Sequence, residues 1–132
     1  MSDEDSWAFL REPRIGVLSV NRAGHAPHAS PIWFLVEDDG IEFTVSSASV
    51  KASVLREPTL ASLTVHSDAW PYRYVTLDGR ARVVRERTTD DLRLFAGRYL
   101  GDLLKDAYVD SVKHGGVIIR LDVAKITDVD FR

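Results

Sequence analysis

A cluster of hydroxyl side chains and one lysine lies where a predicted strand, residues 41–46, gives way to a predicted helix, residues 50–57. Ser46, Ser47 and Ser49 supply the hydroxyls, and Lys51 falls in the first turn of the helix. That turn carries unpaired N–H groups and a partial positive charge, so acidic residues are usual there. A lysine becomes favourable when an anion lies beside it, which predicts a phosphate site. The alternative is a Lys51 side chain in water with Ser49 as an ordinary N-cap.

Three aromatic residues are candidates for contact with a flat ligand. Trp33 lies in a predicted strand, residues 28–37, and either stacks on a ligand ring or fills the core. Tyr72 and Tyr74 share one face of a predicted strand, residues 72–86, and Arg73 points to the other face. No catalytic residue is identified.

Four side chains are candidate proton donors or substrate contacts. They are Tyr72, Arg73, Arg98 and Tyr99. Tyr99 lies on the apolar side of its predicted helix and is expected to pack, whereas Arg98 is expected to face solvent.

Several chemistries are excluded or disfavoured. The chain has no cysteine, which excludes thiolate nucleophiles, disulfides and iron–sulfur clusters. His25 and His28 have no carboxylate at metal-ligand spacing, so no metal site is predicted. A net charge of −3 disfavours nucleic-acid binding. The chain has no apolar run of membrane-spanning length and its start is acidic, so we expect a cytoplasmic protein with no membrane association.

Short β-rich runs dominate the chain and predict a single domain, residues 1–132, built on an all-β, closed or partly closed sheet. The glycine of Asp38-Asp39-Gly40 predicts a tight hairpin, and Gly79 predicts a bulge. The apolar-rich run GVIIRLDVAKITDVDF, residues 116–131, predicts one long strand or two short ones. Further strands are expected at residues 14–20 and 60–67.

Two further helices are predicted. The first carries Trp7, Phe9 and Leu10 and ends before Pro13. The second covers residues 88–106, with Thr89 as its cap. Its apolar stripe consists of Leu92, Phe95, Tyr99 and Leu103.

Three segments together resemble a known family. They are IGVLSVNRAGHAPHASPIWF, FTVSSASVKASVLREP and VTLDGRARV. In order and spacing they are similar to the split β-barrel flavin-binding family that includes pyridoxamine-5′-phosphate oxidase and the deazaflavin (coenzyme F420) dependent reductases. The resemblance covers about residues 6 to 130 and implies a mainly β split barrel with short α-helices, assembled as a homodimer.

The resemblance also implies the cofactor contacts, at two sites that each use both subunits. Ser30, Pro31, Ile32 and Trp33 match the strand that runs along the isoalloxazine-type ring. The segment that holds the ribityl and phosphate groups is matched by Val45, Ser46, Ser49 and Lys51. Arg73 and Tyr74 match a strand start that approaches the cofactor from the partner subunit.

Two departures from the family pattern distinguish the F420-dependent reductases from the FMN-using oxidases. Val50 stands where FMN-using oxidases have an arginine, and the C-terminal substrate-binding segment of true pyridoxamine-phosphate oxidases is missing. The implied function is therefore an F420-dependent reductase that transfers a hydride to a conjugated small-molecule substrate. The alternatives are an FMN-dependent oxidoreductase and a non-catalytic module that binds a cofactor or tetrapyrrole.

Overall fold

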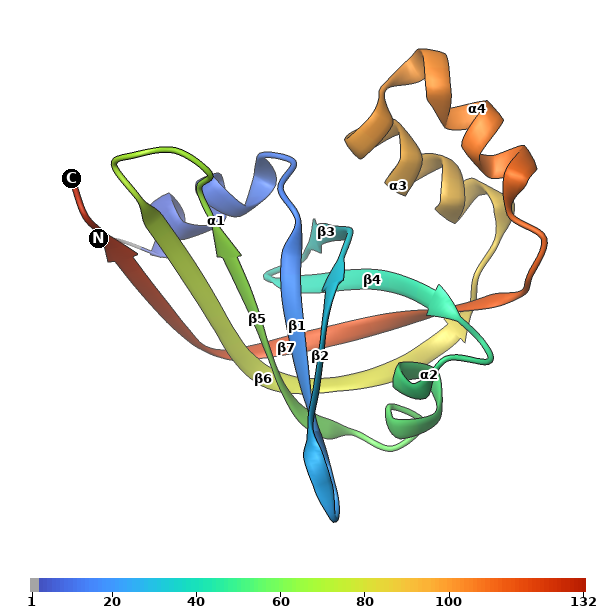
Figure 1. Cartoon of the computed structure of the whole chain (residues 1–132), viewed down its shortest axis with the longest axis horizontal. Coiled ribbons are helices and arrows are strands. Elements are labelled where there is room, and N and C mark those ends of the chain that lie inside the picture. Colours follow the sequence, from blue (N-terminus) through green and yellow to red (C-terminus); the bar gives the residue numbers. More distant parts are fainter. Residues whose placement is uncertain (1–2) are drawn as a thin grey trace.

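The computed structural model describes residues 3–132, which form one seven-stranded antiparallel sheet and four helices (Figure 1). The sheet order is β2-β1-β5-β6-β7-β4-β3. The helices are α1 (Asp3–Arg11), α2 (Val50–Val54), α3 (Thr89–Leu100) and α4 (Asp102–Ser111). The strands are β1 (Gly16–Arg22), β2 (His25–Ile32), β3 (Phe34–Glu37), β4 (Gly40–Ser46), β5 (Thr59–His66), β6 (Arg73–Glu86) and β7 (Gly116–Asp130).

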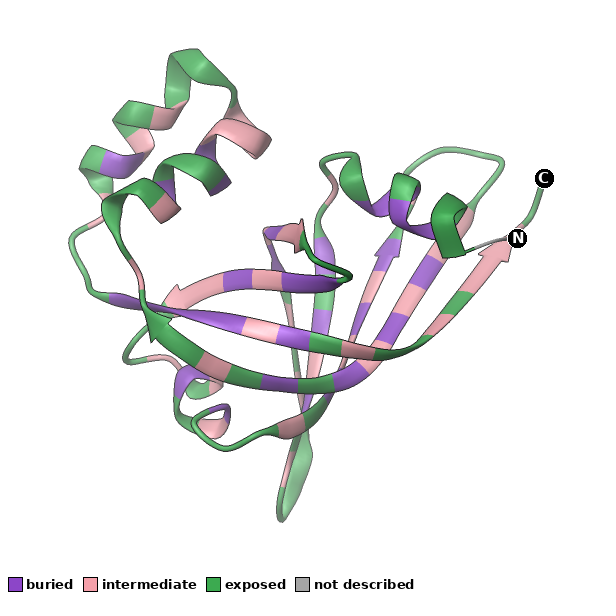
Figure 2. Cartoon of the chain, turned by 180° about the vertical axis from the view of Figure 1, so that it is seen from behind, coloured by how far each residue is buried: buried purple, intermediate pink, exposed green. Residues whose placement is uncertain are grey.

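The core lies on the concave side of this curved sheet. Leu18, Leu63 and Leu77 face one another across β1, β5 and β6 and are fully buried. Their neighbours along each strand point outward, so buried and less buried residues alternate along the strands (Figure 2). The mainly β, antiparallel fold with short helices is as predicted.

Helix α1 covers part of this core, as the sequence predicted. Trp7, Phe9 and Leu10 are buried against the sheet, and the acidic residues of the first turn stay exposed. Acidic side chains at that end also complement the helix dipole. Burial of the apolar face therefore fixes α1 at one end of the sheet.

Strands β6 and β7 bend together at Gly79, where the predicted bulge is confirmed. Their register shifts between Asp78 and Gly79. A Cβ atom on Gly79 would lie 1.9 Å from the backbone oxygen of Asp122. Glycine is needed here because the two backbones approach too closely for any side chain.

The Asp38-Asp39-Gly40 hairpin forms, but the predicted role of its glycine is wrong. Positive φ angles occur at Asp38 (45°) and Asp39 (56°), the two central positions of the turn. A Cβ atom at Gly40 would lie 2.5 Å from a guanidinium nitrogen of Arg120, so the glycine leaves room for that side chain. That guanidinium donates hydrogen bonds to the carbonyls of Glu37 and Asp38.

The predicted strand 28–37 is interrupted at Trp33, which separates β2 from β3. Each of these two strands pairs with one neighbour within residues 3–132, β2 with β1 and β3 with β4. The sheet therefore curves into a barrel that stays open between them.

The predicted helix 88–106 is two helices, because Gly101 adopts a positive φ of 81° and ends α3. The cap is Thr88 and not Thr89, and it forms a reciprocal capping box with Asp91. Leu103 does not join the apolar stripe, since it follows the break and is 96% exposed. Within residues 3–132 no helix has both the length and the apolar character needed to cross a bilayer.

Candidate functional site

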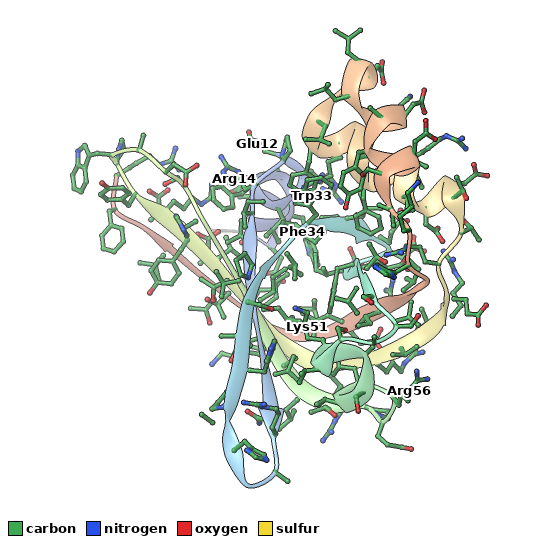
Figure 3. The ribbon with its side chains drawn as sticks, turned by 45° about the vertical axis from the view of Figure 1, so that its right-hand side comes forward. Glu12, Arg14, Trp33, Phe34, Lys51 and Arg56 are labelled. Carbon is green, nitrogen blue, oxygen red and sulfur yellow. The ribbon has the colours of Figure 1, made fainter. Side chains whose placement is uncertain are left out.

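The ammonium of Lys51 is held between α2 and β2. Lys51 lies on α2 (Figure 3) and is half-buried. Its Nζ donates a hydrogen bond of 2.5 Å to the Oγ of Ser30. The alternative is therefore wrong for the Lys51 side chain, which bonds to Ser30. Its other part is confirmed, because Ser49 is the N-cap of α2. This contact joins the segment expected at the phosphate to the strand expected at the ring.

Burial lowers the pKa of Lys51 below its usual 10.5, because the ammonium loses water without gaining a negative charge. Among residues 3–132, no Asp or Glu carboxylate lies within 4.0 Å of its Nζ. Neither do the described residues place three His, Asp or Glu side chains around a possible metal position. An ammonium in these surroundings gains most from an anionic ligand.

Three serine hydroxyls of the predicted site retain a hydrogen to donate. Ser49 accepts from the backbone N–H of Ala52 at 3.1 Å, and Ser46 accepts from that of Ala48 at 3.3 Å. Ser30 accepts from Lys51. Because each hydroxyl is used here as an acceptor, its own O–H stays available for a phosphate oxygen. The donor set of one ammonium and three hydroxyls fits the phosphate of a flavin-type cofactor.

Helix α2 is shorter than predicted and has only five residues. Leu55 follows as its C-cap and is fully buried, and its carbonyl accepts from the N–H of Val83 at 2.7 Å. One turn of helix contributes a weak dipole. The positive charge of this site therefore comes mainly from Lys51.

The predicted ring strand is an edge strand, because β2 ends the sheet order. Its outer backbone edge is open, and Pro31 is tolerated in an edge strand without loss of ladder hydrogen bonds. The side chain of Ile32 is buried in the core, and that of Val45 packs against the same core. Ile32 and Val45 could thus contact a ligand through their backbone atoms and not through their side chains.

Trp33 packs against the helical hairpin of α3 and α4. Its ring stacks on Tyr99 with centroids 5.0 Å apart and planes 3° apart, and Tyr108 lies 5.1 Å away at 45°. Figure 3 shows Trp33 beside this helical hairpin, whereas Lys51 lies on α2, apart from it. The structure therefore gives Trp33 a packing role, with its residual exposed surface left for a ligand.

Two of the candidate proton donors have structural roles. The hydroxyl of Tyr99 donates to the carbonyl of Arg14 at 2.8 Å and accepts from the N–H of Phe34 at 3.1 Å. The expectation that Tyr99 packs is confirmed. The expectation that Arg98 faces solvent is wrong, because its guanidinium donates to the carbonyls at the end of α1, those of Leu10, Arg11 and Glu12.

Arg73 and Tyr74 lie far from Lys51 within one chain. They begin β6 and pair with Asp130 and Val129 near the C-terminus, at the opposite end of the barrel from α2 (Figure 1). Arg73 forms an ion pair of 2.7 Å with Asp128, and Tyr72 beside it is 49% exposed. The structure thus brings Ser30 to Lys51 and places Ser46 and Ser49 on the segment just before α2, but it does not bring Arg73 and Tyr74 to them.

A second group of residues near Arg73 was not predicted from the sequence. Phe9, Arg14 and Arg132 meet Arg73 around a cavity of about 520 Å³. These residues come from three distant parts of the chain, and no motif connects them. Only the fold of α1 against β6 and β7 brings them together.

Comparisons with known proteins agree with this architecture. The sequence model of the pyridoxamine 5′-phosphate oxidase family matches residues 3–130. A conserved hypothetical protein from Mycobacterium tuberculosis shares 25% identity and a TM-score of 0.77, over 100% of this chain and 86% of that chain. Comparison with curated proteins gave no match.

Two more distant solved structures share the fold. A putative pyridoxamine 5′-phosphate oxidase from Listeria innocua has 16% identity and a TM-score of 0.74, over 96% of this chain and 97% of that chain. An FAD binding protein from Mycobacterium smegmatis has 18% identity and a TM-score of 0.69, over 100% of this chain and 98% of that chain. The predicted split-barrel fold is confirmed. With its family match extending over nearly the whole sequence, this chain belongs to the pyridoxamine 5′-phosphate oxidase family.

Proposed function

We propose that the chain is an oxidoreductase that uses a deazaflavin of the F420 type to transfer a hydride to a conjugated small molecule. The observation that carries the proposal is the half-buried ammonium of Lys51, bonded to Ser30 and without a carboxylate within 4.0 Å in residues 3–132. Such a group suits the phosphate of a flavin-type cofactor. Family membership supports the same class of cofactor.

In this proposal the protein positions its ligands and does little covalent chemistry itself. Lys51 and the hydroxyls of Ser30, Ser46 and Ser49 hold the phosphate, and the open backbone edge of β2 lies along the ring. The bound cofactor supplies the hydride chemistry. The chain's contribution is orientation and exclusion of water, which needs no nucleophile or metal.

FMN or FAD is the second candidate cofactor. Several solved structures with this fold are named FAD binding proteins, including those from Mycobacterium smegmatis and Mesorhizobium loti. Val50 argues for the deazaflavin, because it lacks the positive charge that the FMN-using oxidases have beside the lysine. Direct titration separates the two.

A homodimer is part of the proposal, because the two halves of the expected site lie at opposite ends of one chain. A partner subunit would bring its Arg73 and Tyr74 to Lys51. An uncharged row on the outer face of the sheet also supports it: Val17, Thr64 and Thr76 are adjacent across β1, β5 and β6. Val17 is 41% exposed although apolar. Such a row is compatible with packing against a second copy.

The dimer is tested by light scattering on a Val17→Glu variant. A buried charge opposes association, so we expect the variant to be monomeric and to bind cofactor more weakly. Leu94→Glu, at a 60% exposed apolar position on α3, is the matched control and should stay dimeric. A monomeric wild-type protein would contradict this part of the proposal.

The cofactor is tested by titrating F420, FMN, FAD and riboflavin into the purified protein. We expect F420 to bind most tightly, riboflavin to bind poorly for lack of a phosphate, and Lys51→Ala to weaken F420 binding by about 1.5–3 kcal/mol. Arg56→Ala removes an exposed cation just after α2 and should have little effect. Equal F420 affinity in both variants would contradict the proposal.

Turnover distinguishes an enzyme from a binding module. We expect substrate-dependent oxidation of reduced F420 with at least one conjugated acceptor from a broad panel. Tight binding of the cofactor, or of haem or another tetrapyrrole, without any turnover would favour the non-catalytic alternative.

A further inference from the structure

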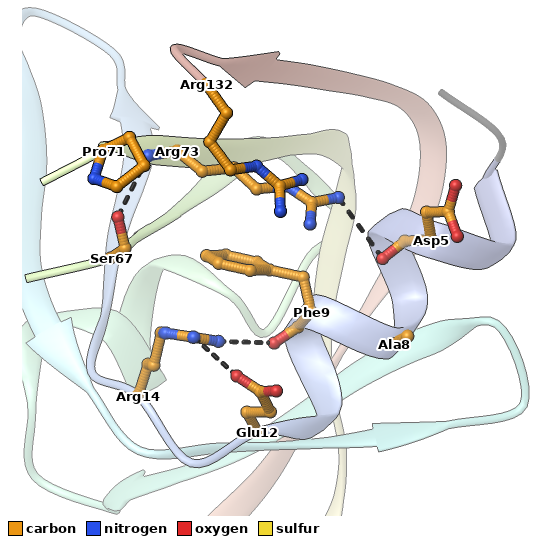
Figure 4. Close-up of a pocket in the computed structure, with 9 residues that line it drawn as sticks. All are labelled: Asp5, Ala8, Phe9, Glu12, Arg14, Ser67, Pro71, Arg73 and Arg132. Carbon is orange, nitrogen blue, oxygen red and sulfur yellow. Dashed lines mark hydrogen bonds and ion pairs between the residues drawn. The ribbon is translucent and has the colours of Figure 1, made fainter. Parts of the chain in front are cut away.

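A cavity of about 520 Å³ opens at the end of the barrel opposite α2. It lies between α1, the loop that joins β5 to β6, and the C-terminal end of β7, and Figure 4 shows its lining. Neither Lys51 nor Ser30 lines it. Within one chain the cavity is therefore separate from Lys51 and Ser30. Arg73 lines the cavity and is also the residue that the proposed dimer would bring toward the cofactor of the partner subunit, so only contacts within one chain carry the inference.

Three guanidinium groups converge on this cavity around one buried aromatic ring. The Cζ of Arg14 lies 3.9 Å from the centroid of Phe9, and that of Arg73 lies 4.8 Å from it. Figure 4 shows the Phe9 ring between Arg14 and Arg73, with Arg132 next to Arg73. Stacking on the ring fixes the planes of the guanidinium groups.

Hydrogen bonds hold two of these groups in place. Asp128, whose side chain is 7% exposed, accepts from the Nε of Arg73 at 3.1 Å and from its Nη2 at 2.7 Å. Arg14 donates to the carbonyl of Phe9 at 2.8 Å and to the carboxylate of Glu12 at 2.6 Å. The arginines are thus oriented before any ligand arrives, which lowers the entropic cost of binding.

Donor capacity remains after these contacts. Arg132 pairs with Asp130 through Nε and Nη2. The Nη1 groups of Arg73 and Arg132 donate no hydrogen bond within residues 3–132. Two neighbouring guanidinium groups repel each other, and an anion between them would relieve that repulsion.

We propose that this cavity binds a small organic monocarboxylate, with its carboxylate against Arg73 and Arg132 and its apolar part against Phe9 and Pro71. Glu12, Asp128 and Asp130 each pair with one of the three arginines, and Asp5 also lines the cavity. The ligand is therefore held by oriented guanidinium donors and not by surplus positive charge, so one negative charge suits the cavity better than several. Its volume is in the range of small-molecule sites.

The proposal is tested by calorimetric and NMR titration of the purified protein with benzoate, cinnamate and hexanoate, and with neutral benzamide. We expect saturable binding of at least one carboxylate, little binding of benzamide, and about tenfold weaker carboxylate binding in Arg132→Gln. The side chain of Arg132 is 62% exposed, so this variant keeps the buried pair of Arg73 and Asp128.

Matched variants assign the binding to this cavity. Lys113→Gln removes an exposed cation elsewhere and should bind the carboxylate as the wild type does. Lys51→Ala should also retain it, which separates this site from the proposed cofactor site. Binding lost in Lys51→Ala, binding unchanged in Arg132→Gln, or no saturable binding of any of the three carboxylates would overturn the proposal.

Discussion

The Nζ of Lys51 and the Oγ of Ser30 meet at 2.5 Å although 21 residues separate them in the sequence. Their contact joins α2 to the edge strand β2. Each residue alone is unremarkable in type, since serine and lysine are common on protein surfaces. Together they create a half-buried positive charge that is bonded to a serine hydroxyl.

The lowered pKa of Lys51 predicts how cofactor affinity depends on pH. A bound phosphate favours the protonated lysine, so affinity should be full at neutral pH and fall as the pH rises through the lowered pKa toward 10.5. In Lys51→Arg the charge persists at every pH used, and this lysine-dependent fall should disappear. Dissociation constants measured from pH 7 to about pH 10.5 check the prediction. Identical pH profiles in the two proteins would contradict it.

Tyr99 should stabilise the fold through its hydroxyl. Tyr99→Phe removes hydrogen bonds to the backbone of Arg14 and Phe34, so we expect a loss of about 1–2 kcal/mol in the free energy of unfolding, measured in urea. Tyr108→Phe is the control, because Tyr108 also contacts Trp33 but its hydroxyl has no hydrogen-bond partner in the described part of the chain. A similar loss in both variants would show that ring packing, and not the hydroxyl, is responsible.

Gly79 should be intolerant of any side chain. The Cβ atom of Gly79→Ala would lie 1.9 Å from the backbone oxygen of Asp122, so β6 and β7 must separate and the free energy of unfolding should fall by about 3 kcal/mol. Gly97→Ala tests the specificity of this effect. Its Cβ atom meets nothing nearer than 3.6 Å, within α3, and should stabilise the protein by about 0.5–1 kcal/mol. Thermal or urea unfolding of the two variants should therefore change in opposite directions.

The start of α3 should lose stability in acid. Asp91 accepts two hydrogen bonds from Arg85, at 2.6 and 2.9 Å, and these together with Thr88 lower its pKa from 3.8 to about 2. A lowered folded-state pKa stabilises the protein above pH 3.8, and that contribution disappears as the pH falls to about 2. We expect about 1 kcal/mol, since Arg85 is half exposed and solvent screens the pair.

Urea unfolding at a series of pH values measures this effect. In Asp91→Asn this loss of unfolding free energy in acid should be missing. Asp90→Asn changes a neighbouring carboxylate that is 91% exposed, and this variant should keep the loss. Equal acid sensitivity in Asp91→Asn and the wild type would exclude Asp91 as its source.

The sequence by itself determined the main features of the fold. Alternating apolar residues specified the strands, because each strand buries one face, and Gly79 marked the bulge because two backbones touch there. The order of motifs indicated the family. The position of Lys51 in a serine-rich segment is also the basis of the predicted anion site, since a cation in a first turn is unfavourable without a counter-charge.

Tertiary structure alone decided how the charged and aromatic side chains are used. Arg98 was expected in solvent, yet it caps α1, because the carbonyls at that helix end belong to residues nearly ninety positions away. Trp33 interrupts a predicted strand because Tyr99 and Tyr108 pack on its ring. The cavity beside Phe9 likewise depends on Arg73 and Arg132, from the far end of the sheet. Such contacts are non-local, so neither periodicity nor spacing along the chain specifies them.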